Sequence, residues 1–344
     1  MYKIIFIFLT LITFLNDSYA QQDAQFSQYM FNGLYYNPGY AGIEGVTRGT
    51  VITRRQWLGY KNSDGYNSPG GNSPTSQAIM VNSRLPFLKS RTGAGLGIVY
   101  DNYGPITSYE IQLSGAYHVK IGDGLLGIGG RAGTYAQSLK GDWYQVVDTQ
   151  DPIYTSLVNN NSKQLKLDYA AGLWYQATKW YVGASINHLS RQKFSYNVTN
   201  ISSVINNHMY FTGGYIFTLS NTLKVTPTAM VQTDLKQYTI LVGPMVDYNS
   251  KFWVGLNARQ SAGKKDVVSG GNSVWSVNDM IGYAGVNLMK NNALKVGFAF
   301  DFVLSGHKGT AGTSHEIMLS YMVPSPGGVP KPKVRTPRYR HDEN

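Results

Sequence analysis

The chain has 344 residues, a formal net charge of +11 and no cysteine. The lack of cysteine excludes disulfides, thiol nucleophiles and thiolate metal sites. Such a positive surplus suits nucleic acid, acidic lipid head groups or an acidic protein partner. With 26 tyrosines and 38 glycines, the composition favours a β-barrel over a helical membrane protein.

Residues 1–20 predict a signal peptide that is removed on export. Lys3 provides a positive start, residues 4–15 form an apolar run, and Ser18-Tyr19-Ala20 is a small-x-small cleavage site. The run is shorter than the roughly 20 residues that a membrane-spanning helix needs. We therefore expect an exported chain that begins at Gln21. Because exported proteins seldom meet nucleic acid, the positive charge indicates acidic lipid or an acidic protein instead.

Residues 21–45 form an aromatic segment ahead of every strand-like stretch. Phe26, Tyr29 and Met30 have helical spacing, and Asn37-Pro38 then forces a turn. A short amphipathic helix must bury its aromatic side, so the segment either caps a hydrophobic rim or plugs the mouth of a barrel. The residues expected to carry this role are Gln25, Phe26, Ser27, Gln28, Tyr29, Met30, Asn32, Tyr36, Asn37, Pro38, Tyr40 and Gly42.

The stretch 46–323 shows repeated alternation of apolar and polar side chains, as in Glu110-Ile111-Gln112-Leu113. Membrane barrels show this pattern in segments of roughly 9–11 residues, and bacterial barrels have an even number of strands. Fourteen segments are predicted as strands: 46–54, 77–84, 93–101, 106–119, 125–138, 166–176, 179–189, 208–219, 222–233, 237–248, 251–260, 275–289, 293–304 and 313–322.

The connections between these segments alternate in length. Tight turns at 120–124, 177–178, 220–221, 249–250 and 290–292 alternate with long loops at 55–76, 139–165, 190–207 and 261–274; the exceptions are 102–105 and 234–236. Outer-membrane barrels have short periplasmic turns and long outer loops. The sequence thus predicts an all-β, transmembrane antiparallel outer-membrane β-barrel of about 14 strands, with both termini in the periplasm.

Ionisable side chains on the polar faces are expected to point into the lumen. An Arg or Lys that faces lipid at the midplane costs about 2–4 kcal/mol. Such groups either form ion pairs that fill a closed lumen or line a selective pore, and the sequence leaves both open. They are Glu110, Lys120, Arg131, Lys295, Asp301 and Glu316.

The long loops carry aromatic residues among Asn, Ser and Gly, as protein-binding surfaces do. Anchoring of the barrel rim in lipopolysaccharide is the alternative. The residues are Trp57, Tyr60, Tyr66, Trp143, Tyr144, Tyr154 and Tyr196.

The last stretch, 324–344, is rich in proline, which excludes helix and strand pairing. It is either a disordered tail or a polyproline-like peptide that docks on an acidic periplasmic partner. Its basic residues are Lys331, Lys333, Arg335, Arg338 and Arg340.

Apparent chemical motifs do not support catalysis. The glycines of Gly122-Asp123-Gly124-Leu125-Leu126-Gly127 fit G-x-G-x-x-G, but they occupy a turn and a strand and no helix follows. His188 and Ser190 are two residues apart at a strand end, without a G-x-S-x-G motif or an evident orienting carboxylate. The six histidines show no metal-ligand spacing. We therefore expect no catalytic residue, cofactor or metal.

The opening residues resemble a known family. Gln22-Asp23, residues 25–32 (QFSQYMFN), Asn37-Pro38 and residues 40–42 (YAG) are similar to the opening motif of the PorP/SprF family. These are outer-membrane proteins of the type IX secretion and gliding machinery of Bacteroidetes. Gly33 and Gly39 depart from the proline and alanine that the family often has. Weaker likenesses lie at 55–59, 95–97 and 315–317.

The resemblance implies a non-enzymatic barrel that assists secretion or surface attachment of a cognate adhesin by binding the adhesin's C-terminal domain. It also implies contacts with periplasmic components of the secretion and gliding machinery. A porin or transporter for small solutes is the alternative from another class. From its residues, the chain is predicted to divide into a signal peptide (1–20), an aromatic plug or docking segment (21–45), a barrel (46–323) and a periplasmic tail (324–344).

Overall fold

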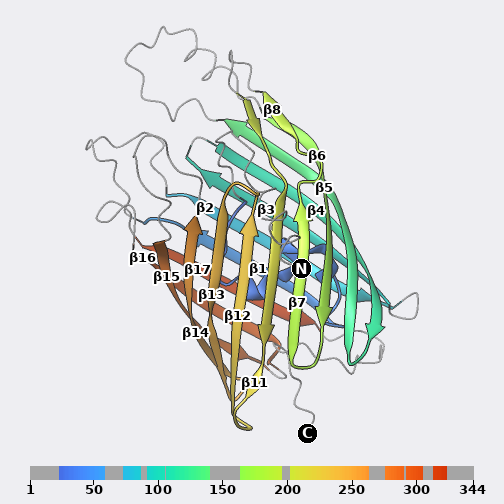
Figure 1. The fold of residues 1–344 in the computed structure, drawn as a ribbon, viewed down its shortest axis with the longest axis vertical. Helices are drawn as coiled ribbons and strands as arrows, with labels where there is room; N and C mark the ends of the chain where they lie inside the picture. Colours follow the sequence, from blue (N-terminus) through green and yellow to red (C-terminus); the bar gives the residue numbers. More distant parts are fainter. Residues whose placement is uncertain are drawn as a thin grey trace, which may run out of the picture.

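The computed structural model of the chain describes residues 23–58, 73–86, 91–104, 106–139, 163–195, 202–262, 276–289, 292–304 and 313–323. Fourteen antiparallel strands form a closed ring (Figure 1). They are β1 (Thr47–Arg55), β2 (Thr75–Leu85), β3 (Thr92–Tyr103), β4 (Ile106–Ile121), β5 (Gly124–Leu139), β6 (Gln164–Gln176), β7 (Trp180–Asn187), β10 (His208–Tyr215), β12 (Leu223–Thr233), β13 (Tyr238–Tyr248), β14 (Phe252–Ala262), β15 (Ser276–Leu288), β16 (Leu294–Val303) and β17 (Ser314–Val323).

The ring follows the order of the chain and closes between its first and last strands. Thr47 of β1 lies opposite Val323 of β17, and Arg54 lies opposite Glu316. Each predicted segment coincides with one strand of the ring to within a few residues, so the predicted barrel is confirmed. Because every ring strand has two hydrogen-bonded neighbours, the barrel has no open edge in the membrane.

Among the described residues, three short strands lie outside the ring, and the two that fall in the predicted loop 190–207 were not predicted. β8 (Lys193–Ser195) and β9 (Ser202–Val204) form a hairpin inside the predicted loop 190–207. Phe194 of this hairpin is fully buried and packs on Tyr135 of β5, which joins the hairpin to the wall. β11 (Phe217–Thr218) pairs with β12 after the chain leaves β10 at Ile216.

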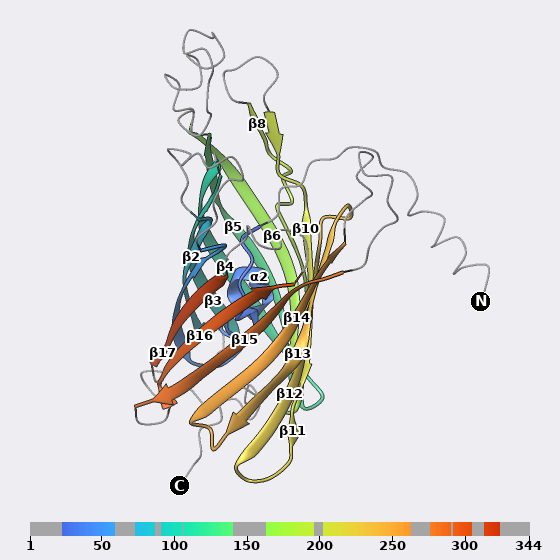
Figure 2. The same cartoon turned by 90° about the vertical axis from the view of Figure 1, so that its left-hand side faces the viewer.

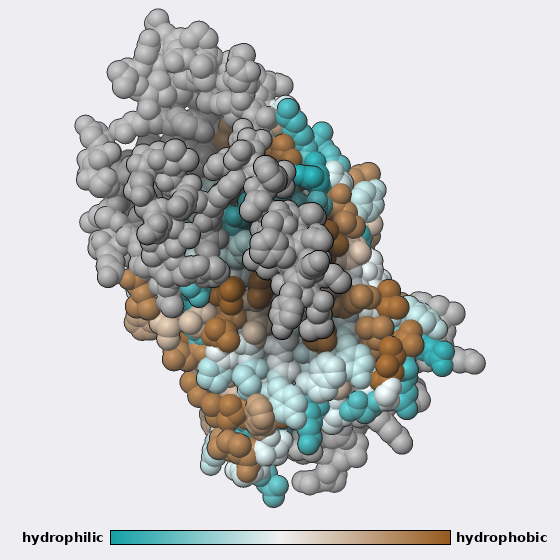
Figure 3. Space-filling model, viewed as in Figure 1, coloured by the Kyte–Doolittle hydropathy of each residue, from teal (hydrophilic) through white to brown (hydrophobic). Residues whose placement is uncertain are grey.

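The wall is polar inside and apolar outside. In β4, Glu110 and Gln112 are buried, whereas the alternate residues Ile111 and Leu113 are 51% and 61% exposed. Large apolar side chains are exposed on most strands, and Figure 3 shows them gathered on the flanks of the wall. This arrangement is the reverse of a water-soluble sheet and suits a wall surrounded by lipid. Among the described residues, the helices are too short to cross a membrane.

The interior is occupied by residues 23–45, which we call the inner segment (Figure 2). It makes three single turns: η1 (Tyr29–Phe31), α2 (Gly33–Tyr36) and η2 (Pro38–Tyr40). The predicted single amphipathic helix is therefore wrong, because Asn32 (φ −120°, ψ 41°) leaves the helical region between η1 and α2. Asn37 is extended (φ −141°, ψ 115°) because the residue before a proline disfavours the helical region. The predicted turn does form, and the Asn37 side chain accepts a hydrogen bond from Gly39 N at 2.8 Å.

The inner segment runs along the lumen. Asp23 contacts His188, directly after β7, at the end of the barrel where the long connections lie, here called the loop end. Glu44 pairs with Arg48 at the start of β1, at the opposite or turn end. β17 also finishes at the turn end, where Val323 lies beside Thr47. The two ends of the described chain thus lie at opposite ends of the barrel. The expectation that both termini share one side is not supported, because the chain passes through the lumen before β1 begins.

Glycines on the inner face of the wall allow the inner segment to approach closely. A Cβ atom on Gly129 of β5 would collide with the backbone of Pro38 and Gly39, and one on Gly172 of β6 would collide with the Asn37 side chain. The G-x-G-x-x-G pattern has a similar structural origin. Gly122 (φ +59°) forms the turn between β4 and β5, and Gly127 lies against Gly39. The pattern continues into strand β5 and is not followed by a helix, as predicted.

A pair of neighbouring glycines tests this packing. Gly129→Ala should lower the free energy of unfolding by about 1–3 kcal/mol, because the added methyl group overpacks a site bounded by backbone. The matched control is Gly130→Ala, whose methyl group would meet nothing within 4 Å on the outer face. Urea unfolding of the refolded barrel measures both, and equal stability of the two variants would contradict the role of Gly129.

Candidate functional site

A buried charge cluster near the loop end holds the beginning of the inner segment. Asp301 Oδ2 of β16 lies 2.7 Å from Arg54 Nη2 of β1 and 2.9 Å from Arg259 Nη1 of β14. The Ser27 hydroxyl donates to Asp301 Oδ1 at 2.7 Å. Arg54 also donates to the backbone oxygen of Gln25 at 2.5 Å. One carboxylate therefore joins three strands of the wall to the inner segment.

A second carboxylate binds the backbone of the same segment. Glu316 of β17 accepts hydrogen bonds from Ser27 N at 2.7 Å and from Gln28 N at 2.8 Å. Both amides lie just before η1, where a turn leaves donors without internal partners, so an anion is favourable there. Glu316 is 1% exposed, so these bonds replace water almost entirely.

Two cations of the wall bind the middle of the segment. Arg131 of β5 donates to the backbone oxygens of Leu34 (2.5 Å) and Tyr35 (2.8 Å), which are carbonyls of α2. Lys295 Nζ of β16 lies 4.8 Å from the centroid of the Phe31 ring, a cation–π contact. The predicted lumen charges Asp301, Glu316, Arg131 and Lys295 thus all contact the inner segment.

The two remaining predicted lumen charges behave differently. Glu110 is buried and accepts a hydrogen bond from Gln112 Nε2 at 2.7 Å, a neighbour on its own strand. Lys120 is exposed near the end of β4. Its position on the polar face matches the prediction, but it lies beyond the buried part of the wall, so it is not enclosed in the lumen.

Aromatic rings of the inner segment pack on aromatic rings of the wall. The Phe31 and Trp253 ring centroids are 4.7 Å apart, and those of Tyr40 and Trp174 are 4.8 Å apart. The Tyr36 ring lies 5.2 Å from that of Tyr210. These contacts lie on β14, β6 and β10, and the charge contacts on β1, β5, β16 and β17 complete the contact around the ring.

The rest of the opening motif is also enclosed. Asn37 Nδ2 donates to the backbone oxygens of Leu173 (2.9 Å) and Ala184 (3.1 Å), and Tyr29 OH donates to Thr228 Oγ1 at 2.9 Å. Gly42 N donates to Asn82 Oδ1 at 3.3 Å. The lumen also buries the motif residues Phe26, Met30, Asn32 and Pro38.

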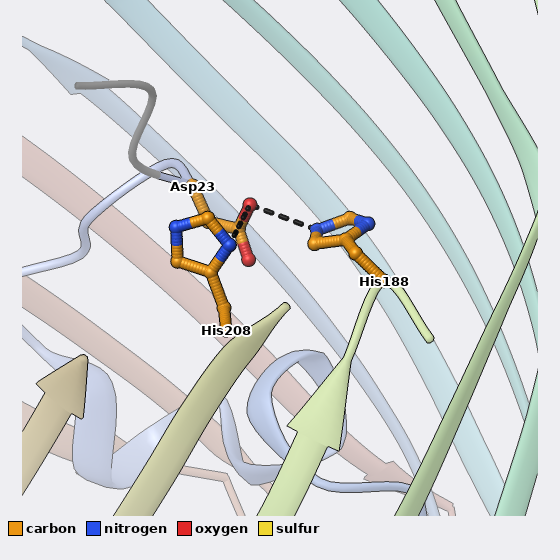
Figure 4. Close-up of side chains that lie close together, drawn as sticks. All are labelled: Asp23, His188 and His208. Carbon is orange, nitrogen blue, oxygen red and sulfur yellow. Dashed lines mark hydrogen bonds and ion pairs between the residues drawn. The ribbon is translucent and has the colours of Figure 1, made fainter. Parts of the chain in front are cut away.

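Asp23, His188 and His208 form a second polar cluster at the loop end (Figure 4). Asp23 Oδ1 lies 2.9 Å from His188 Nε2 and 3.7 Å from His208 Nδ1. Tyr210 OH donates to Asp23 Oδ2 at 2.5 Å, and Asp168 Oδ2 lies 3.1 Å from His188 Nδ1. Sequence spacing did not suggest this cluster, because its members come from the inner segment and from the ends of three strands.

The charges of this cluster support one another. Burial alone would raise the pKa of the Asp23 carboxyl, but the imidazoles of His188 and His208 hold that pKa well below its usual range. Burial alone would lower the pKa of His188, but Asp23 and Asp168 raise it well above its usual value. The orienting carboxylates expected to be lacking around His188 are therefore present. Ser190 is not their partner, since its hydroxyl donates to the Leu167 backbone oxygen at 3.0 Å.

Of the two predicted partner-binding sets, only Trp57 lies within the described residues. Trp57 is half-buried after β1, with φ +53°, and its N donates to Ser314 Oγ at 3.3 Å. Tyr60, Tyr66, Trp143, Tyr144, Tyr154, Tyr196 and the whole tail 324–344 lie outside the described residues.

A cavity of about 300 Å³ lies beside these groups at the loop end. Its lining includes Asp23 and Gln25 of the inner segment, Arg54 and Arg259 of the charge cluster, and Trp57. The inner segment therefore leaves a polar recess at this end of the lumen.

Comparisons with known proteins agree with the barrel. The family model described as "Type IX secretion system membrane protein PorP/SprF" matches residues 18–321. A TodX monoaromatic hydrocarbon channel with the deltaS2S3 mutation is 10% identical, with a TM-score of 0.50 over 85% of this chain and 94% of that channel. A FadL homologue from Pseudomonas aeruginosa is 10% identical, with a TM-score of 0.45 over 82% and 93%. The likeness to TodX shows the fold alone. No curated protein matches the sequence.

Removing the central carboxylate tests the charge cluster. Asp301→Ala leaves the buried guanidinium groups of Arg54 and Arg259 without this partner, and we expect a loss of about 3–5 kcal/mol in the free energy of unfolding. Asp123→Ala, at an exposed turn between β4 and β5, is the control and should change stability little. If urea unfolding shows that the two variants are equally stable, Asp301 does not hold the inner segment.

Proposed function

Because the chain belongs to the PorP/SprF family of type IX secretion system membrane proteins, we propose that it is a closed, non-enzymatic outer-membrane barrel that assists secretion or surface attachment of a cognate adhesin. The observation that carries this proposal is the inner segment. Its aromatic residues are buried within the ring, and wall charges bind its backbone. A lumen occupied in this way favours binding at the ends of the barrel over passage of solutes through it.

The loop end is the proposed site for the C-terminal domain of the adhesin. Trp57 lies there beside the polar cavity, and the predicted loops carry six further aromatic residues. Aromatic side chains supply large contact areas at low entropic cost, and polar groups nearby give specificity. The outward face of the wall is proposed to contact lipid, including lipopolysaccharide at the outer rim.

The turn end is the proposed site for periplasmic components of the secretion and gliding machinery. β17 finishes at this end, so the basic, proline-rich stretch 324–344 begins there. A proline-rich peptide loses little entropy on binding, and its positive charge favours an acidic partner.

Pull-down of the tagged full chain from detergent-solubilised outer membranes tests the adhesin proposal. We expect a large surface protein to be recovered through its C-terminal domain. Trp57→Ala should lower its recovery by about fivefold or more, the effect of a contact worth about 1 kcal/mol. Trp180→Ala removes an exposed tryptophan at the turn end and is the matched control. Steady ion conductance of the purified barrel in a planar bilayer, with no adhesin recovered, would instead support a porin.

Deletion of residues 324–344 tests the periplasmic proposal. The truncated barrel should fold normally, because the ring closes at Val323, but it should recover less of the periplasmic components in the same pull-down. A full-length variant in which glutamine replaces the five basic residues separates charge from proline content. Recovery of periplasmic components that is unchanged by the deletion would refute the docking role of the tail. The five basic residues replaced by glutamine in the charge variant are Lys331, Lys333, Arg335, Arg338 and Arg340.

A further inference from the structure

The cluster of Asp23, His188 and His208 has the geometry of a metal-binding site. Each residue offers one ligand atom, and these atoms all lie within 4.8 Å of one another. Figure 4 shows the two imidazoles on either side of the carboxylate. Ligand atoms about 2.0–2.2 Å from a common ion, as around Zn²⁺, lie only a few ångströms apart, so small side-chain movements would place all three around one ion.

The outer atoms of two of these residues are already held by other groups. Asp23 Oδ2 accepts a hydrogen bond from Tyr210 OH at 2.5 Å, which leaves Oδ1 facing the histidines. Asp168 Oδ2 lies 3.1 Å from His188 Nδ1, which leaves Nε2 facing Asp23. Metal-binding histidines and carboxylates commonly have such partners, which orient them and raise the basicity of the ligand atom.

His208 presents its Nδ1 atom to the cluster. Its side chain is 2% exposed, and within the described part of the chain its Nε2 has no hydrogen-bond partner. Nδ1 lies 3.1 Å from the backbone oxygen of Asn206 and 3.7 Å from Asp23 Oδ1. Nδ1 is therefore the nitrogen that an ion beside Asp23 would meet, and it would exchange the Asn206 oxygen for the metal, which imidazole binds in its neutral form.

We infer that Asp23, His188 and His208 bind one divalent transition-metal ion, for which Zn²⁺ is the best match. Two imidazole nitrogens and one carboxylate oxygen suit Zn²⁺, whereas Ca²⁺ and Mg²⁺ prefer oxygen ligands alone. The fourth position is left to water or another small ligand. The alternative is a cluster held by ion pairs alone, and metal binding distinguishes the two.

Such an ion would join the beginning of the inner segment to the wall. Asp23 is the first described residue of the segment, whereas His188 follows β7 and His208 opens β10. The connection 188–207 leaves the barrel between these two histidines, so the ion would also hold the two ends of this loop together. The site does not depend on which protein the barrel binds.

Titration of the purified full chain with Zn²⁺ tests the inference, after treatment with a chelator and its removal. Calorimetry should show one ion bound per wild-type chain, and His208→Ala should weaken binding at least tenfold. Asp168→Asn should weaken it by about 10–100-fold, because it removes the partner that orients His188. His315 lies outside the cluster and contacts Thr313, so His315→Ala should leave Zn²⁺ binding unchanged.

Thermal unfolding supplies a second measurement and a check on folding. Zn²⁺ should raise the unfolding midpoint of the wild type, because an ion that binds only the folded state stabilises that state. The midpoint of His208→Ala should be the same with and without Zn²⁺. If His208→Ala does not fold, His208→Gln takes its place. Failure of the wild type to bind Zn²⁺, or binding that is equally strong in the His208 and His315 variants, would overturn the inference.

Discussion

The structure depends on the pairing of buried charges around the start of the inner segment. Asp301 neutralises Arg54 and Arg259 and accepts the hydroxyl of Ser27, all in a part of the lumen shielded from water. A buried charge is tolerated only when its partners replace the water that it has lost. The wall and the inner segment therefore stabilise each other, since either alone would leave polar groups unpaired.

The other contacts follow from this placement. Where the segment's backbone approaches the wall, the wall presents glycine, as at Gly129 and Gly172. Where the segment presents a ring, the wall presents another, as between Tyr40 and Trp174. Small residues and flat rings on the inner face thus shape the lumen around one particular chain path. This complementarity explains why so many inward glycines occur in strands, where glycine is otherwise unfavourable.

An occupied lumen changes what the barrel can offer to other molecules. Its outer face is apolar and suits lipid, so the two ends are the surfaces left for recognition. At the loop end, a charged recess lies beside the Asp23 cluster. At the turn end, the connections are short and β17 finishes. The two ends therefore differ in chemistry, which agrees with the separate partners proposed for them.

The sequence by itself determined the wall. Alternation of apolar and polar residues with a period of two predicts which side chains face lipid, so all fourteen ring strands could be predicted. The lengths of the connections distinguish the two ends of the barrel. It also identified Asp301, Glu316, Arg131 and Lys295 as inward charges. Only the tertiary structure decided what these charges bind. Ser27 and Asp301 are 274 residues apart, and such a contact leaves no trace in local spacing. The direction of the inner segment and the meeting of Asp23 with two histidines have the same origin, because closure of the ring brings together residues that no periodicity connects.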